Sequence, residues 1–248
     1  EREQIGELIR SATDVSPSEE LVTSILAQTD GNPLFITDAL RLIIQENRLS
    51  PEQADDQRTR ELPILDSVRA VIGRRLNSLS KDCNETLSVA SVIGREFPLA
   101  LIQRLFENTH SLTLIGLLEE GLRARILEEQ PDRPGVYQFT HALVHETLLD
   151  EMSLGRRAAL HLNIARSLED IHEHELASHA EELAHHYGQA ANQTDIGAHV
   201  KYLLMAGENA LAAHAPDEAL EYFQSALDVK SNQPMDSEMA RVYLGLAE

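Results

Sequence analysis

The chain has 248 residues and is 42% hydrophobic, so it can form one large domain or two to three small domains with real cores. It carries 41 acidic and 21 basic residues, a net charge of −20, which argues against a large nucleic-acid interface and against an anionic membrane surface. A single cysteine, Cys83, excludes a disulfide framework, and we find no signal peptide or long apolar run. We therefore expect a cytoplasmic protein.

The spacing of apolar residues predicts helices along almost the whole chain. In residues 1–49, Gly31 ends one predicted helix, Asn32 caps the next, and Pro33 occupies its first position. Residues 50–63 are polar and show no periodicity, which is typical of a linker. The chain begins and ends within predicted helices, so we expect it to be a piece of a longer protein.

Residues 64–153 form the second predicted unit. Four amphipathic helices are expected there, one of them capped by Ser80 and another opened by Pro98. The only β pattern of the chain follows, in residues 126–130 and 136–140, which flank a five-residue loop rich in proline and glycine. Helices followed by such a hairpin predict a winged helix.

The hairpin ends where a helical pattern begins. Thr140 lies at this change and is predicted to cap the helix, which places His141 in the first turn. Backbone N–H groups and the helix dipole favour an anion at this position. An imidazole there can donate a hydrogen bond to a phosphate oxygen.

Residues 154–248 are predicted to be helix after helix, and the last part has the pattern of a tetratricopeptide unit. Small residues at Gly207, Ala219 and Ala226 would let two helices approach closely, and Phe223 would fill the space between neighbouring pairs. A further helix looks like the start of another unit that is cut short.

Several of these segments resemble the STAND class of signal-transduction ATPases, in particular the AAA-related regulators similar to MalT and to LuxR-type and cyclase-linked proteins. Gly31-Asn32-Pro33-Leu34-Phe35 is similar to the Gly-x-Pro motif of their helical lid, and residues 92–97 resemble part of their winged helix. Residues 156–169 resemble the first helix after the wing. His141 resembles the histidine of the Met-His-Asp motif, although Thr140 and Ala142 replace the other two residues.

The resemblance implies a mainly α fold, with a helical lid (1–49), a winged helix with one β-hairpin (64–153) and an α-solenoid of tetratricopeptide-like pairs (154–248). It implies that Gly31 and Pro33 contact bound ATP or ADP, with Pro33 against the adenine, and that His141 contacts the β-phosphate of ADP. The chain has no P-loop motif, so it is not expected to be an enzyme itself. Its expected partners are an upstream nucleotide-binding core of the same polypeptide and a protein or small-molecule inducer at the repeats.

Each of these residues also has a simpler interpretation. Gly31 to Pro33 is explained as a helix end followed by a cap, and His141 could bond a neighbouring carbonyl. Cys83 is interpreted as structural, because Asp82 and Glu85 beside it would raise its pKa. The predicted recognition helix of the wing carries two glutamates beside its arginines, which argues against direct DNA binding.

Two other functions compete with the nucleotide switch. One is a helical-repeat interaction scaffold with no nucleotide role. The other is a metal-dependent hydrolase that uses a run of five histidines. No pair in that run has the His-Glu-x-x-His order that sets two ligands on one helix face, so the sequence predicts no metal site. The run consists of His172, His174, His179, His185 and His186.

Overall fold

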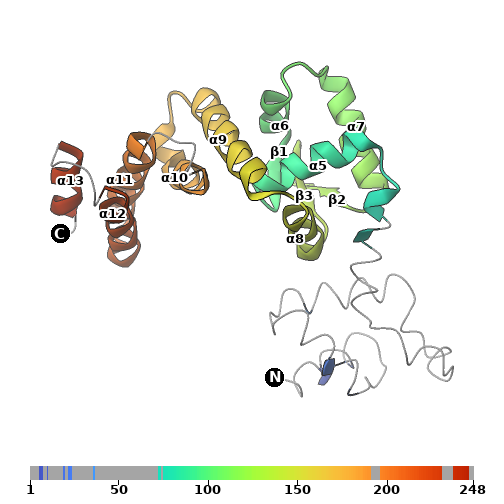
Figure 1. Ribbon diagram of the computed structural model, residues 1–248, viewed down its shortest axis with the longest axis horizontal. Helices are drawn as coiled ribbons and strands as arrows, with labels where there is room; N and C mark the ends of the chain where they lie inside the picture. The colour runs from blue at the N-terminus through green and yellow to red at the C-terminus, as the bar shows by residue number, and fades with distance from the viewer. Residues whose placement is uncertain are drawn as a thin grey trace. The chain divides into compact units, whose positions relative to one another are not determined.

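Figure 1 shows the computed structural model, which describes residues 75–190, 196–230 and 237–245 together with isolated positions before residue 74. These residues are mainly helical and include a small three-stranded sheet. The mainly α class predicted from the sequence is therefore confirmed. The predicted lid and linker, residues 1–63, lie outside the described residues apart from isolated positions.

Two compact units make up the chain. The first unit contains Glu1–Phe97 and Ser111–Glu151, and the second contains Pro98–His110 and Met152–Glu248. The sequence placed residues 98–110 in the winged helix, whereas these residues are grouped with the second unit, in which α6 (Leu99–Leu105) packs on α9 (Leu154–Ile171).

In the first unit, a serine cap and a carboxylate fix the start of α5 (Lys81–Ile93). The Oγ atom of Ser80 accepts a hydrogen bond from the backbone N–H of Cys83 at 3.1 Å, which confirms the predicted cap. The same hydroxyl donates to Glu120 Oε2 on α7 (Ser111–Arg123) at 2.8 Å, and the Ser80 N–H donates to the other oxygen. These bonds join α5 to α7 and hold the pKa of Glu120 below its ordinary value.

Three short strands form the sheet of this unit: β1 (Glu96–Pro98), β2 (Leu127–Glu129) and β3 (Val136–Phe139). Strand β3 lies in the middle, and it pairs with β2 antiparallel, with Leu127 opposite Phe139. The predicted hairpin is confirmed, and Gly135 takes a positive φ of 79° in its loop. The expectation that the hairpin is the only β element is wrong, because the Phe139 N–H donates to the carbonyl of Arg95 at 3.0 Å and β1 joins the sheet.

An aromatic cluster covers one face of the sheet. Tyr137 and Phe139 alternate with more exposed residues along β3, as the strand pattern predicted, and both are buried. Phe97 on β1 is also buried, and its ring centroid lies 6.1 Å from that of Tyr137 and 5.6 Å from that of Phe139. The hairpin is therefore held by side-chain packing as well as by backbone pairing. Helix α8 (Ala142–Asp150) follows directly and packs against α5.

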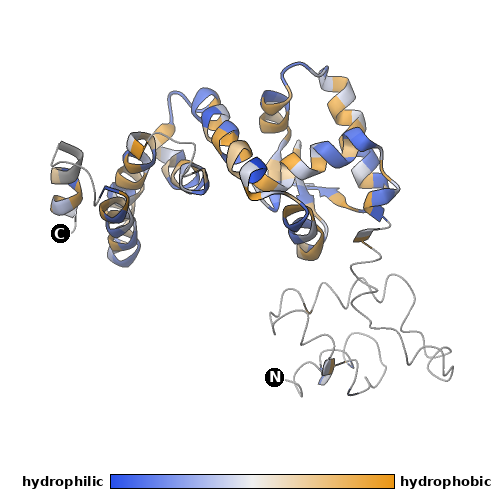
Figure 2. Cartoon of the chain, in the orientation of Figure 1, coloured by the Kyte–Doolittle hydropathy of each residue, from blue (hydrophilic) through white to orange (hydrophobic). Residues whose placement is uncertain are grey.

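In the second unit, consecutive helices pack against each other along the chain. Figure 2 shows hydrophobic and hydrophilic residues alternating along these helices, a pattern typical of amphipathic helices. None of the helices in the described part of the chain is long and apolar enough to cross a membrane. After α6 and α9, the elements are η3 (Leu176–His179), α10 (Ala180–Gln189), α11 (Ile196–Ala212), α12 (Pro216–Lys230) and α13 (Ser237–Gly245).

Phe223 on α12 lies between two glycines on neighbouring helices. A Cβ atom built on Gly207 of α11 would lie 2.8 Å from the Phe223 ring, and one on Gly245 of α13 would lie closer still. The ring is 1% exposed, and Ala219 and Ala226 on the same helix are also buried. The Phe223 ring therefore occupies the space that the missing side chains of Gly207 and Gly245 leave.

A partly buried carboxylate joins three successive helices. Glu169 on α9 accepts hydrogen bonds from the hydroxyl of Tyr187 on α10, at 2.6 Å, and from the hydroxyl of Tyr202 on α11. The two tyrosine rings stack with their centroids 5.6 Å apart. Burial, followed by the bond to Glu169, raises the pKa of each tyrosine, so both remain neutral donors. Tyr187 is a core residue, as the sequence predicted.

Candidate functional site

The first candidate site is the junction between β3 and α8, where the sequence predicted a phosphate contact. His141 itself occupies the N-cap position, with an extended backbone at φ −135° and ψ 137°. The prediction that Thr140 caps the helix is wrong. Pairing of the hairpin brings Thr140 beside the start of β2, where its hydroxyl donates to the carbonyls of Arg125 and Ile126 at 2.9 and 3.2 Å.

His141 stands at the predicted strand-to-helix junction, but its side chain is not on the surface. The residue is 4% exposed, and its imidazole makes no capping hydrogen bond to the helix. Its carbonyl accepts from the N–H of Val144 at 3.1 Å, which begins the first turn. The other predicted nucleotide contacts, Gly31 and Pro33, lie outside the described residues.

His145, one turn later, has a structural partner. Its Nε2 atom lies 2.9 Å from the carbonyl oxygen of Ser91 on α5, so this nitrogen carries the proton and donates it. Its ring also packs against Phe139, with the centroids 5.6 Å apart. His145 therefore joins α8 to α5 and to the sheet, and its imidazole is directed into the unit rather than toward a ligand.

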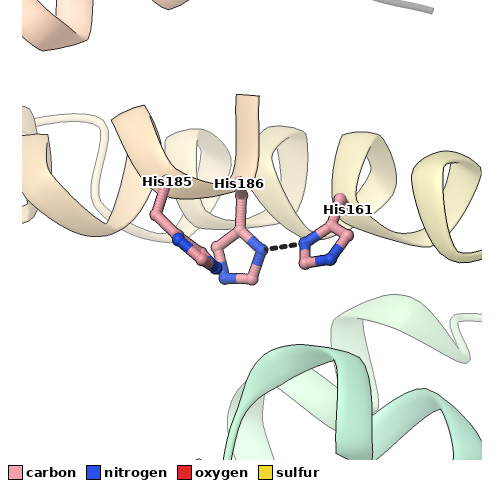
Figure 3. Close-up of side chains that lie close together, drawn as sticks. All are labelled: His161, His185 and His186. Carbon is pink, nitrogen blue, oxygen red and sulfur yellow. Dashed lines mark hydrogen bonds between the residues drawn. The ribbon is translucent and has the colours of Figure 1, made fainter. Parts of the chain in front are cut away.

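The second candidate site is a histidine cluster between α9 and α10, formed by His161, His185 and His186 (Figure 3). One possible ligand nitrogen from each ring lies within 4.8 Å of the other two. The Nδ1 atoms of His161 and His186 are hydrogen-bonded at 2.8 Å. His161 and His186 are buried, whereas His185 is exposed. The cluster thus has a buried interior and one side open to solvent.

Both buried rings are uncharged at neutral pH. Burial, with a smaller effect of nearby His185, lowers the pKa of His161 from 6.5 to about 4. Stronger burial lowers the pKa of His186 to about 3. In the bond between them, one Nδ1 therefore carries a proton and the other accepts it. Neutral imidazoles with available nitrogen lone pairs are the form in which histidine binds metals.

The cluster was not predicted from the sequence, because only the run from His172 to His186 had the density of histidines that suggests a metal site. His161 lies outside the run, on another helix. A signal was nevertheless present: His161 shares a helical stripe with Ile164, Ala165 and Leu168, all of which are buried. His186 shares the corresponding stripe of α10 with Leu183 and Ala190. Two histidines on the apolar stripes of consecutive helices could have predicted a buried pair.

The remaining histidines of the run do not join the cluster. His172 and His179 stack on each other with their ring centroids 3.5 Å apart, and His179 Nδ1 lies 3.4 Å from a carboxylate oxygen of Glu182. His174 is exposed. His172 and His179 therefore pack on each other at the turn that contains η3, as partly exposed histidines were expected to do.

Cys83 is structural, as the sequence indicated, but for a different reason. It is fully buried, and its Sγ atom donates to the carbonyl of Leu117 at 3.3 Å. Burial, followed by the charge of Glu120, raises the pKa of the thiol to about 11. The cause is therefore not the pair of sequence neighbours, Asp82 and Glu85, that the sequence suggested. At neutral pH the reactive thiolate is therefore scarce.

Comparisons with models of known protein families, with curated proteins and with solved structures found no match. Function is therefore inferred from the geometry of the two candidate sites, from the packing of the repeats and from the motifs in the sequence.

Proposed function

We propose that the chain is the regulatory part of a nucleotide-dependent signalling switch of the STAND ATPase type. Its lid (1–49) and winged helix (64–153) would close over ADP bound to a P-loop core in the same polypeptide. The repeats (154–248) would serve as a sensor or interaction array for a protein or a small-molecule inducer. Exchange of ADP for ATP would release the winged helix and change the surface that the repeats expose.

The order of the elements supports the winged-helix part of this proposal. Along the chain they run α5, β1, α6, α7, β2 and β3, and the sheet has the order β1-β3-β2, although α6 is grouped with the second unit. Helices and strands follow each other in this order in a winged helix. The chain then passes from β3 straight into α8, whose N-terminus is the kind of position at which proteins bind phosphate.

The observation that carries the repeat part is the packing of Phe223. Its ring fills the gap between Gly207 and Gly245, which belong to the helices before and after its own. A residue that contacts both neighbours is what a stacked array of helix pairs requires, because each pair buries its apolar face only against the next. Such arrays present extended surfaces that bind other proteins.

The burial of His141 favours a second candidate function, a helical adaptor with no nucleotide role. At 4% exposure the imidazole is a packing residue in this conformation. Contact with a phosphate requires that the surface around the N-terminus of α8 open toward the core. In the adaptor, the same ring would only support the junction between β3 and α8.

Replacing His141 with alanine separates the two functions, in the polypeptide that carries this chain together with a P-loop core. A hydrogen bond to a charged group contributes about 1.5–3 kcal/mol, so the switch predicts ADP binding weaker by about 10- to 100-fold. Calorimetric titration with ADP measures the change.

His145→Ala is the matched control, since it removes an imidazole one turn later that bonds the Ser91 carbonyl. It should lower the melting temperature and leave the ADP affinity of the folded protein unchanged. If His141→Ala also lowers only the melting temperature, the adaptor is the correct function.

A further inference from the structure

The histidine cluster between α9 and α10 has the composition and placement of a metal site. It contains three imidazoles and comes from two helices that pack together within one compact unit. We propose that His161, His185 and His186 bind a divalent transition-metal ion, preferentially Zn²⁺. The ion would join α9 to α10 at the start of the repeats. This site does not depend on the nucleotide switch.

The distances between the rings suit such an ion. Zn²⁺ binds histidine nitrogen at about 2.0–2.1 Å, so the ligands of a tetrahedral ion lie about 3.3 Å from each other. The Nδ1 atoms of His161 and His186 are 2.8 Å apart, and all three ligand nitrogens lie within 4.8 Å. His185 is exposed, so its side chain has room to rotate toward the buried pair.

The protonation of the buried pair also permits binding without loss of a proton to solvent. Both rings are neutral, and one Nδ1–H now bonds to the other Nδ1. If both Nδ1 atoms bind the ion, the donor ring only needs to change to the tautomer that carries its proton on Nε2. The metal would then replace the hydrogen bond as the link between the two helices.

The ligand set selects the class of ion. Three imidazoles suit Zn²⁺, Cu²⁺ and Ni²⁺, whereas Mg²⁺ and Ca²⁺ need carboxylate or carbonyl oxygens. With three protein ligands, a tetrahedral Zn²⁺ keeps its fourth position for water on the side open to solvent. The positive charge of Arg157 lies near His161 and repels a bound cation. We therefore expect the Zn²⁺ affinity to be lower than that of a site that contains a carboxylate.

Zinc titration of the full 248-residue chain, without a purification tag and after treatment with EDTA, tests the proposal. Calorimetry should give one ion per chain, and Co²⁺ in place of Zn²⁺ should produce the strong visible absorption of a tetrahedral site. His185→Ala should weaken Zn²⁺ binding by at least about 100-fold, because loss of even an outer-shell partner costs about 10–100-fold. Since His185 is exposed, this variant leaves the helix packing intact.

His174→Ala is the matched control, because His174 is an exposed histidine of the same run that lies outside the cluster. The His174→Ala variant should bind Zn²⁺ with the same affinity as the unchanged chain. The proposal is overturned if the chain takes up no stoichiometric Zn²⁺, if His185→Ala binds as tightly as the unchanged chain, or if both variants lose affinity equally.

Discussion

Replacing Phe223 with alanine is expected to lower the free energy of unfolding of the repeat helices by about 3–5 kcal/mol, the usual cost of removing a fully buried phenylalanine. The expected cost is large because the ring contacts Gly207 on one side and Gly245 on the other. Neither glycine has a side chain that could fill the cavity. Urea unfolding followed by circular dichroism measures the loss, and hydrogen exchange assigns it to α11, α12 and α13.

Leu220→Ala provides the control on the same helix, because Leu220 is 53% exposed. Truncation of an exposed side chain should change the free energy of unfolding by no more than about 0.5 kcal/mol. If Phe223→Ala lowers the free energy of unfolding no more than Leu220→Ala does, the stacked packing of α11, α12 and α13 is contradicted.

Phe97→Ala should have a similar effect on the first unit, about 3–5 kcal/mol. Phe97 is 1% exposed and packs on Tyr137 and Phe139, so its loss opens a cavity behind the hairpin and removes two aromatic contacts. Urea-dependent pulse proteolysis measures the stability of this unit, with cleavage expected in β2 and β3.

Leu112→Ala is the comparison for this experiment, since Leu112 lies on α7 of the same unit and is 71% exposed. It should leave the proteolysis midpoint nearly unchanged. If Phe97→Ala shifts the midpoint no further than Leu112→Ala does, β1 is not an integral part of the sheet.

The sequence predicted most helices of the described chain because their signals are local. The Ser80 cap of α5, the proline before α6 and the helical spacing of α7, α9 and α12 depend on residues within one or two turns. The hairpin was predicted for the same reason, since its alternation and its Pro-Gly loop are contiguous in sequence.

Features created by contacts between distant segments were missed. Strand β1 has three residues and ends in proline, so it has no readable alternation and exists only because β3 pairs with it. The histidine cluster joins His161 to residues more than twenty positions later, which no local spacing rule connects. Packing also decided the exposure of His141: its place at the start of α8 follows from the sequence, but its burial does not.

The central proposal, that the wing closes over ADP, is tested most directly by hydrogen exchange at the N-terminus of α8. The sample is the polypeptide that joins this chain to a P-loop core, compared in ADP and in ATP. The account predicts that the amides of Leu143 and Val144 exchange about tenfold more slowly with ADP, because the closed wing shields this turn. Equal exchange in the two nucleotides, or a polypeptide with no P-loop core, would contradict it.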